Sequence, residues 1–167
     1  MELQAQEPRR IWWARPRKLC ALERPGGGGR NHRIDRRAAE IEHLRGRGVK
    51  LFVSVMRTRH NLGAYDAAGI EWHHVPVART EDAAAQLEEL LPLLRRELRS
   101  AGAVAVHGDS WTDFPAALCA AHLHEARGAD PPAALAQAAC AGLTVTPAAC
   151  ALLGVEPKEV EAFMRVS

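Results

Sequence analysis

Short apolar runs alternate with longer amphipathic segments along most of the chain. The runs at 50–56 (KLFVSVM), 70–77 (IEWHHVPV) and 103–107 (AVAVH) have the β-rich or fully apolar character of buried strands. Two shorter runs, 11–13 and 19–22, lie around Pro16 and are predicted as edge strands. The apolar runs therefore predict the strands of one sheet.

Apolar periodicity predicts helices between these strands. One helix should run from Asp35 to about Arg45, and a short one should cover 62–68 and end at Gly69. The longest should cover 81–99, capped by Thr80 and kinked at Pro92. Its core-facing stripe recurs at three- and four-residue spacing, at Leu87, Leu91, Leu94 and Leu98.

The last third of the chain is predicted to be helical. A proline opens and a glycine ends a helix from Pro115 to Arg127, and two more helices should begin at Pro131 and Pro147. A final helix is expected over 157–164. We therefore predict an α/β fold: a central, mostly parallel sheet flanked by helices, with a helical C-terminal third. Residues 1–10 should be a disordered tail, 25–29 a flexible glycine linker, and 11–167 a single domain.

Composition narrows the classes of function. Hydrophobic residues make up 47% of the chain and the formal net charge is +2, so neither disorder nor a nucleic-acid or membrane surface is indicated. Four cysteines without a Cys-x-x-Cys pair, and an N-terminus without an apolar run, favour a cytoplasmic protein with reduced thiols.

No motif indicates a cofactor. His73 and His74 are neighbours on a strand and point to opposite faces, so no metal site is expected. Nothing indicates an oligomeric state.

In α/β folds, sites lie where loops leave the carboxyl ends of the strands, here after Met56, Val77 and His107. The ordered set of segments around these loops resembles the dual-specificity and tyrosine-phosphatase-like family, in particular its small atypical bacterial members. The segments that carry the resemblance are 13–26, 41–56 (IEHLRGRGVKLFVSVM), 69–77 (GIEWHHVPV) and 101–123, within an overall span of about 13–127.

The resemblance implies a phosphate-binding loop between the AVAVH strand and the next helix. Family members have His-Cys-x-x-Gly-x-x-Arg there: backbone N–H groups hold the phosphate, a low-pKa thiolate attacks it, and the arginine clamps its oxygens. An aspartic acid after the preceding strand protonates the leaving group. In this chain the loop is HGDSWTDF, with Gly108, Trp111 and Phe114 at the cysteine, glycine and arginine positions. Ala78 and Arg79 stand where the aspartic acid is expected.

By this alignment the chain should not hydrolyse phosphate esters by the thiolate route. His107 matches the family, but a histidine that ends a buried strand is more often structural than catalytic. Cys119 is too far into the helix to replace the nucleophile, and Ser110 and Thr112 lack an obvious base.

Phosphate binding by the altered loop is opposed by its acidic residues. A helix N-terminus favours an anion by about 0.3–1 kcal/mol, whereas two like charges about 4 Å apart cost on the order of 4 kcal/mol at an effective dielectric near 20. Asp109 and Asp113 should therefore exclude phosphate unless Arg57, Arg59 or Arg79 compensates.

The aromatic residues Trp111 and Phe114 should line or plug the former phosphate pocket. If they line it, a neutral or cationic organic ligand fits better than a phosphate.

Two functions follow as hypotheses. The first is a pseudophosphatase, a binding or regulatory protein with a small-molecule or protein ligand in the former phosphate cleft, held by residues of the altered loop and its neighbours: Arg57, Arg79, Gly108, Ser110, Trp111, Thr112 and Phe114. The second is a cofactor-independent enzyme of isomerase, cyclase or lyase type, with His107, Asp109 and Asp113 as its acid–base groups. A residual phospho-ligand binder using Arg57, Arg59 and Arg79 is a third possibility.

Overall fold

The structure is a computed structural model, and it describes residues 4–77, 80–109 and 112–166. Within these residues five strands form one mixed sheet in the order β1-β2-β5-β3-β4. Their bounds are β1 Ile11–Arg15, β2 Leu19–Glu23, β3 Val49–Ser54, β4 Glu71–His74 and β5 Ala103–Gly108.

The sheet is parallel except at one edge. The pairs β2–β5, β5–β3 and β3–β4 are parallel, and only β1 pairs antiparallel, with β2. The prediction of a mostly parallel sheet is therefore confirmed. The prediction of two edge strands holds for β1 alone, because β2 lies between β1 and β5 and is almost fully buried.

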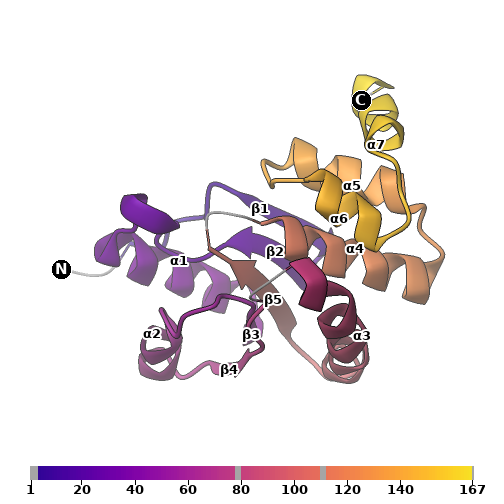
Figure 1. The fold of residues 1–167 in the computed structure, drawn as a ribbon. Helices are drawn as coiled ribbons and strands as arrows, with labels where there is room; N and C mark the ends of the chain where they lie inside the picture. The colour runs from indigo at the N-terminus through magenta and orange to yellow at the C-terminus, as the bar shows by residue number, and fades with distance from the viewer. Residues whose placement is uncertain (1–3, 78–79, 110–111, 167) are drawn as a thin grey trace.

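Seven α-helices and one short 3-10 turn connect and cover the strands of the described chain. They are α1 Ile34–Gly46, α2 Leu62–Ala67, α3 Thr80–Glu97, α4 Asp113–Arg127, α5 Pro131–Cys140, α6 Pro147–Leu152, α7 Pro157–Val166 and the turn η1 Gly29–Asn31. Figure 1 shows α1 and α2 on one side of the sheet and α3 to α6 on the other, with α7 at the far end of the helical third. The predicted α/β class and helical C-terminal third are confirmed.

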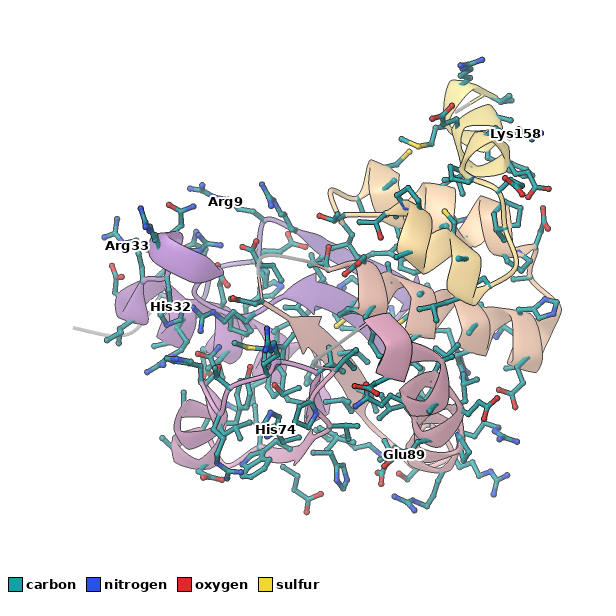
Figure 2. The ribbon with its side chains drawn as sticks, in the orientation of Figure 1. Arg9, His32, Arg33, His74, Glu89 and Lys158 are labelled. Atoms are coloured by element: carbon teal, nitrogen blue, oxygen red, sulfur yellow. The ribbon has the colours of Figure 1, made fainter. Side chains whose placement is uncertain are left out.

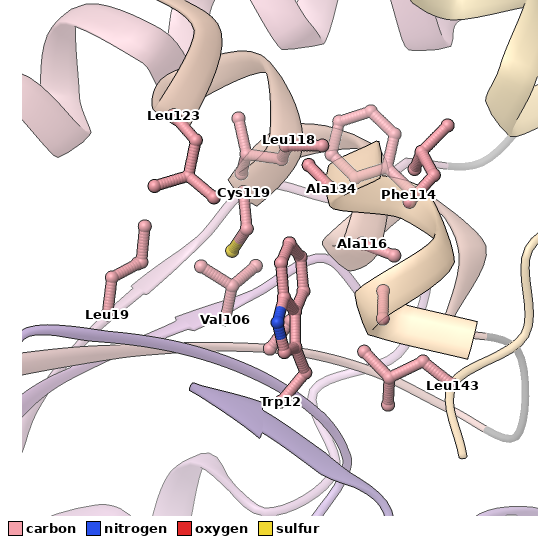
Figure 3. Packing of buried hydrophobic residues seen from close by; sticks show 14 of the residues in the cluster. Trp12, Leu19, Val106, Phe114, Ala116, Leu118, Cys119, Leu123, Ala134 and Leu143 are labelled. Atoms are coloured by element: carbon pink, nitrogen blue, oxygen red, sulfur yellow. The ribbon is translucent and has the colours of Figure 1, made fainter. Parts of the chain in front are cut away.

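Alternate residues of the central strands face two separate cores. On β5, Val104 and Val106 face the core under α3 and α4, whereas Ala103 and Ala105 face the core under α1 and α2. Figure 3 shows the larger core, where Trp12 of β1 packs among side chains of α4 that include Cys119. This alternation follows from the two-residue period of a strand, and it fixes which side chains can reach the sheet's carboxyl edge.

Several boundaries differ from the sequence prediction. Helix α1 begins one residue before Asp35, and α4 begins two residues before Pro115. Strand β4 ends at His74, because residues beyond it pair only through single bonds such as Val77 N to Val55 O.

The predicted glycine linker is instead a buried turn between β2 and η1. Gly26 and Gly27 are buried and have φ of +94° and +87°. In the N-terminal segment, the Gln6 amide donates to the Ala39 carbonyl over 3.1 Å and Pro8 is buried. Residues 1–3 of the predicted tail lie outside the described residues. Within the described chain, no helix combines the length and apolarity needed to cross a bilayer.

Candidate functional site

The carboxyl ends of three adjacent strands meet at one edge of the sheet. Backbone bonds continue past the strands and hold their loops together: the Arg24 amide donates to Gly108 O over 2.9 Å, and the Val55 amide donates to His107 O over 3.0 Å. The end of β5 is thus fixed between the continuations of β2 and β3. The segments that follow β3 and β5, which include the loops after Met56 and His107, therefore lie together at this edge. The residues directly after Val77 lie outside the described residues.

A cavity of about 470 Å³ lies at this edge, and we call it the strand-end cavity. Its wall is mostly apolar, formed by Val55, Met56, Val77, Phe114, Ala149 and Leu152. Gly108, Asp109, Asp113 and Arg57 also line it. The cavity has the size and character of a small-molecule pocket, with a few polar groups on an apolar surface. Phe114 is itself 93% buried and forms part of the wall without closing the cavity.

His107 directly precedes the cavity-lining Gly108 and is fully buried. Its Nε2 lies 2.8 Å from the Tyr65 hydroxyl, and Tyr65 stacks on Phe52 with ring centroids 4.0 Å apart. Burial lowers the pKa of His107 to about 4, with the positive charge of Arg24 acting in the same direction. The imidazole is therefore neutral at neutral pH and does not line the cavity, which places it as a structural group between β5 and α2.

The Asp109 carboxylate contacts two residues of the segment that follows β2, Arg24 and Gly29. Its Oδ1 lies 3.2 Å from Arg24 Nε and accepts a bond of 3.2 Å from the Gly29 amide. Arg24 is 94% buried and also donates to Gly27 O over 2.9 Å, whereas the Asp109 side chain is 47% exposed. The arginine thus offsets part of the negative charge that the sequence assigns to the loop.

Sequence reasoning did not find Arg24, which lies 85 positions before Asp109. The strand order reveals its role. Glu23 pairs with Gly108 in the parallel ladder of β2 and β5, so the residues that follow them, Arg24 and Asp109, lie next to each other. Treating β2 as an edge strand hid this relationship.

Asp113 and Thr112 connect the start of α4 to the C-terminal helices. Thr112 is 1% exposed, and its Oγ1 accepts a bond of 2.7 Å from the Thr144 amide. Asp113 Oδ2 accepts a bond of 3.1 Å from Thr146 Oγ1, which also caps α6 by accepting from the Ala149 amide. These bonds bring α6 over the strand ends as one wall of the cavity, a contribution that the sequence did not indicate.

The remaining candidate residues divide into three groups. Of the three arginines, Arg57 lines the cavity, whereas Arg59 lies over the Trp72 ring with 5.4 Å to its centroid. Thr112, like His107, is buried in contacts within the protein. Arg79, Ser110 and Trp111 lie outside the described residues.

No thiol lies in the cavity among the residues that the structure describes. Cys119 is fully buried under β1 and β5, and burial raises its pKa well above the usual range. Burial likewise raises the pKa of Cys20 and Cys150, which points to protonated core thiols.

His74, labelled in Figure 2, has its Nε2 2.7 Å from Met56 O. In the described part of the chain, no group of three or more His, Cys, Asp or Glu side chains is placed to hold a metal ion.

Comparison with known proteins gives a clear result for the fold alone. No family model and no curated protein matches the sequence. Among solved structures, the chain is similar to human DUSP28, with 24% identity and a TM-score of 0.65 over 95% of this chain and 97% of that one. It is also similar to P. aeruginosa TpbA in complex with phosphotyrosine, at 19% identity and a TM-score of 0.70 over 98% and 96%.

A mouse putative dual specificity phosphatase complexed with zinc tungstate is similar over 99% of this chain and 96% of that one, with 21% identity and a TM-score of 0.65. The chain therefore has the fold of the dual-specificity and tyrosine phosphatases. Residues 109–112 connect β5 to α4 and stand in the chain where the sequence resemblance puts the phosphate-binding loop, although 110 and 111 lie outside the described residues.

Proposed function

We propose that this protein is a pseudophosphatase: it keeps the phosphatase fold but acts as a binding protein for a small organic ligand, neutral or cationic, in the strand-end cavity. The observation that carries the proposal is the composition of that cavity. Gly108 and Phe114, which align with the nucleophilic cysteine and the clamp arginine, both line it, and no cysteine does so among the described residues.

The cavity supports binding rather than thiolate chemistry for a second reason. A thiolate needs nearby positive charge and solvent access, whereas the cysteines on α4 and α6 are buried with raised pKa values. A phosphate dianion would also meet Asp109 and Asp113, and Arg57 is the one cation among the described lining residues.

The residues that line the strand-end cavity also indicate the class of ligand. The mostly apolar wall and the two carboxylates favour a molecule with an apolar body and a neutral or positively charged polar group. Asp109 has its Oδ1 engaged by Arg24 and Gly29, but the side chain is 47% exposed, so the carboxylate remains accessible to a ligand.

An aryl phosphate assay tests the loss of phosphatase activity. The unmodified protein is expected to release no product above background from p-nitrophenyl phosphate. The variant Gly108→Cys/Phe114→Arg restores the two aligned groups, and a gain of turnover in it would support the alignment. Robust turnover by the purified, unmodified protein would overturn the proposal.

A thermal-shift screen tests ligand binding. Amphiphilic amines and neutral aromatic compounds should raise the melting temperature, whereas the matched carboxylic acids should not. The variant Ala148→Arg, in the part of α6 that lines the cavity, should abolish the shift by placing a large charge there. Ala151→Arg, at an exposed position of α6 that does not line the cavity, should not. If both variants respond alike, or if acids bind as well as amines, the assigned pocket or ligand class is wrong.

One observation favours a second function, a cofactor-independent acid–base enzyme. Asp109 is a half-exposed carboxylate at an apolar cavity, the setting in which a carboxylate can act as a general base. His107, the partner considered in the sequence, is buried against Tyr65 and does not take part.

Incubation with cell metabolite extracts, followed by mass spectrometry, would test the enzyme. A compound consumed by the unmodified protein and not by Asp109→Asn would support it. Consumption that persists in both Asp109→Asn and Asp113→Asn would exclude these carboxylates as the acid–base groups.

A further inference from the structure

A second and larger cavity, of about 1050 Å³, lies between the N-terminal segment, the η1 turn and the start of α1. We call it the arginine groove, because five arginines line it: Arg9, Arg10, Arg30, Arg33 and Arg36. Figure 2 shows Arg9 and Arg33 on the side of the molecule that carries α1, far from Lys158 on α7. It shares no lining residue with the strand-end cavity.

The groove concentrates positive charge. Glu23 and Asp35 are the carboxylates among its described lining residues, so five guanidinium groups and two carboxylates give a formal charge of +3. The whole chain carries only +2. Positive charge is therefore concentrated in the groove, where the buried Glu40 that pairs with Arg36 lowers the net value to +2. A bound anion would relieve the repulsion between the guanidinium groups.

Not all of the five arginines are neutralised within the fold. Arg10 pairs with Glu23 over 3.5 Å, Arg33 pairs with Asp35 over 3.3 Å, and Arg36 pairs with Glu40 at the base of the groove. Arg9 and Arg30 are exposed, and within the described chain no carboxylate lies within 4.0 Å of either. Two guanidinium groups, one from the N-terminal segment and one from the η1 turn, are thus available to an anion.

The rest of the lining limits the class of ligand. Among its described lining residues the only apolar side chains are Ala5 and Ala39, and none is aromatic. A nucleic-acid base would have no aromatic ring to stack on, and a peptide would find no pocket for an apolar anchor. Guanidinium groups instead bind phosphate oxygens in bidentate fashion.

We propose that the arginine groove binds a small, non-aromatic ligand that carries two or more phosphate groups. Several phosphates are needed because the two free guanidinium groups, Arg9 and Arg30, come from separate segments. The proposal does not depend on the pseudophosphatase assignment, since its residues lie outside the strand-end cavity.

Calorimetric titration with inorganic tripolyphosphate tests this site. The unmodified protein should bind with a Kd below about 1 mM at low salt, and more weakly as salt is added, because the contacts are exposed and charged. The variant Arg9→Ala/Arg30→Ala should bind about ten-fold more weakly or worse. The control Arg99→Ala/Lys158→Ala removes the same charge from exposed positions elsewhere and should bind within two-fold of the unmodified protein.

Three results would overturn the proposal. The first is no heat at millimolar tripolyphosphate. The second is an equal effect of the two double variants, which would mean that net charge alone attracts the anion or that it binds elsewhere, as at the former phosphate loop. The third is binding of a doubly phosphorylated peptide in the absence of tripolyphosphate binding, which would assign the groove to a protein partner. Circular dichroism confirms that the variants are folded.

Discussion

The imidazole of His107 matches a motif of the resembled family, yet in this structure it is shielded from solvent. It is fully buried, bonded to Tyr65, and flanked by the Phe52 ring with 6.2 Å between centroids. Its environment favours the neutral form, because burial removes the hydration that an imidazolium needs. The histidine is therefore a contact between β5 and α2, and its titration is coupled to folding.

Acid should destabilise the protein through this histidine. The pKa is about 4 in the folded protein and near 6.5 in an unfolded chain, so the unfolded state binds more protons between these values. Lowering the pH from 7.5 to 5 should then remove about 2 kcal/mol of stability through His107 alone. In His107→Gln, the loss of unfolding free energy over this range, measured by urea denaturation at each pH, should be smaller by about that amount.

Tyr65→Phe is the matched control for the pH experiment. It removes the hydroxyl that contacts His107 but leaves the imidazole buried, so the pH dependence of the unmodified protein should persist. His32 and His122, whose pKa values burial also lowers, titrate in all three proteins and do not affect the comparison. Equal pH dependence in His107→Gln and the unmodified protein would contradict the assignment.

Single residues also mark the limit of what the sequence could predict. The residues Gly108, Asp109 and Phe114 could be identified from the sequence because they lie in one short segment that follows an apolar strand. Arg24 was not, because its role depends on which strand neighbours β5, and short apolar runs do not encode their order in a sheet. The charge at the site is thus a property of strand order as well as of the loop.

At the scale of elements, the glycine turn after β2 is the clearest departure from the sequence prediction. A run of glycines predicts flexibility, but here buried side chains hold it: Glu40 accepts from the Gly26 amide over 2.9 Å, and Asn61 donates to Pro25 O over 2.9 Å. The turn links β2 to α1 and supports Asp109 through the Gly29 amide. Its glycines provide a backbone conformation and close packing rather than mobility.

Gly26→Ala should therefore destabilise the fold. The residue has φ of +94°, and an added Cβ would lie 2.8 Å from Arg37 Cβ and 2.9 Å from Arg33 O. Because one of these atoms belongs to the backbone, the turn must shift. We expect a loss of about 2–4 kcal/mol in the free energy of unfolding, measured by denaturant titration.

Gly63→Ala is the control for this substitution. Gly63 is exposed in α2, and a Cβ there would meet no atom within 4 Å. Alanine favours the helix by up to about 1 kcal/mol, so this variant should be as stable as the unmodified protein or more so. A mobile linker would instead tolerate both substitutions equally.

At the scale of the whole molecule, the fold could be predicted better than the site. Strand runs such as β5 and proline-led helices such as α5 and α6 are local patterns, and the structure confirms them. The position of α6 over the strand-end cavity is not local: it depends on bonds from Thr112 and Asp113 to residues more than thirty positions away. The cavity is therefore a product of how the helical third docks on the sheet.

Thr112→Val should loosen this docking without disturbing the sheet. The substitution keeps the shape of a fully buried side chain but leaves the Thr144 amide without its acceptor, at a cost of about 1–3 kcal/mol. Hydrogen exchange should quicken at the Thr144 amide and in α6 while β3 and β5 stay protected. Thr144→Val is the control, because it keeps the backbone donor and changes only a half-buried side chain. Unchanged exchange in Thr112→Val, or equal acceleration across β5, would show that Thr112 does not hold α6 over the cavity.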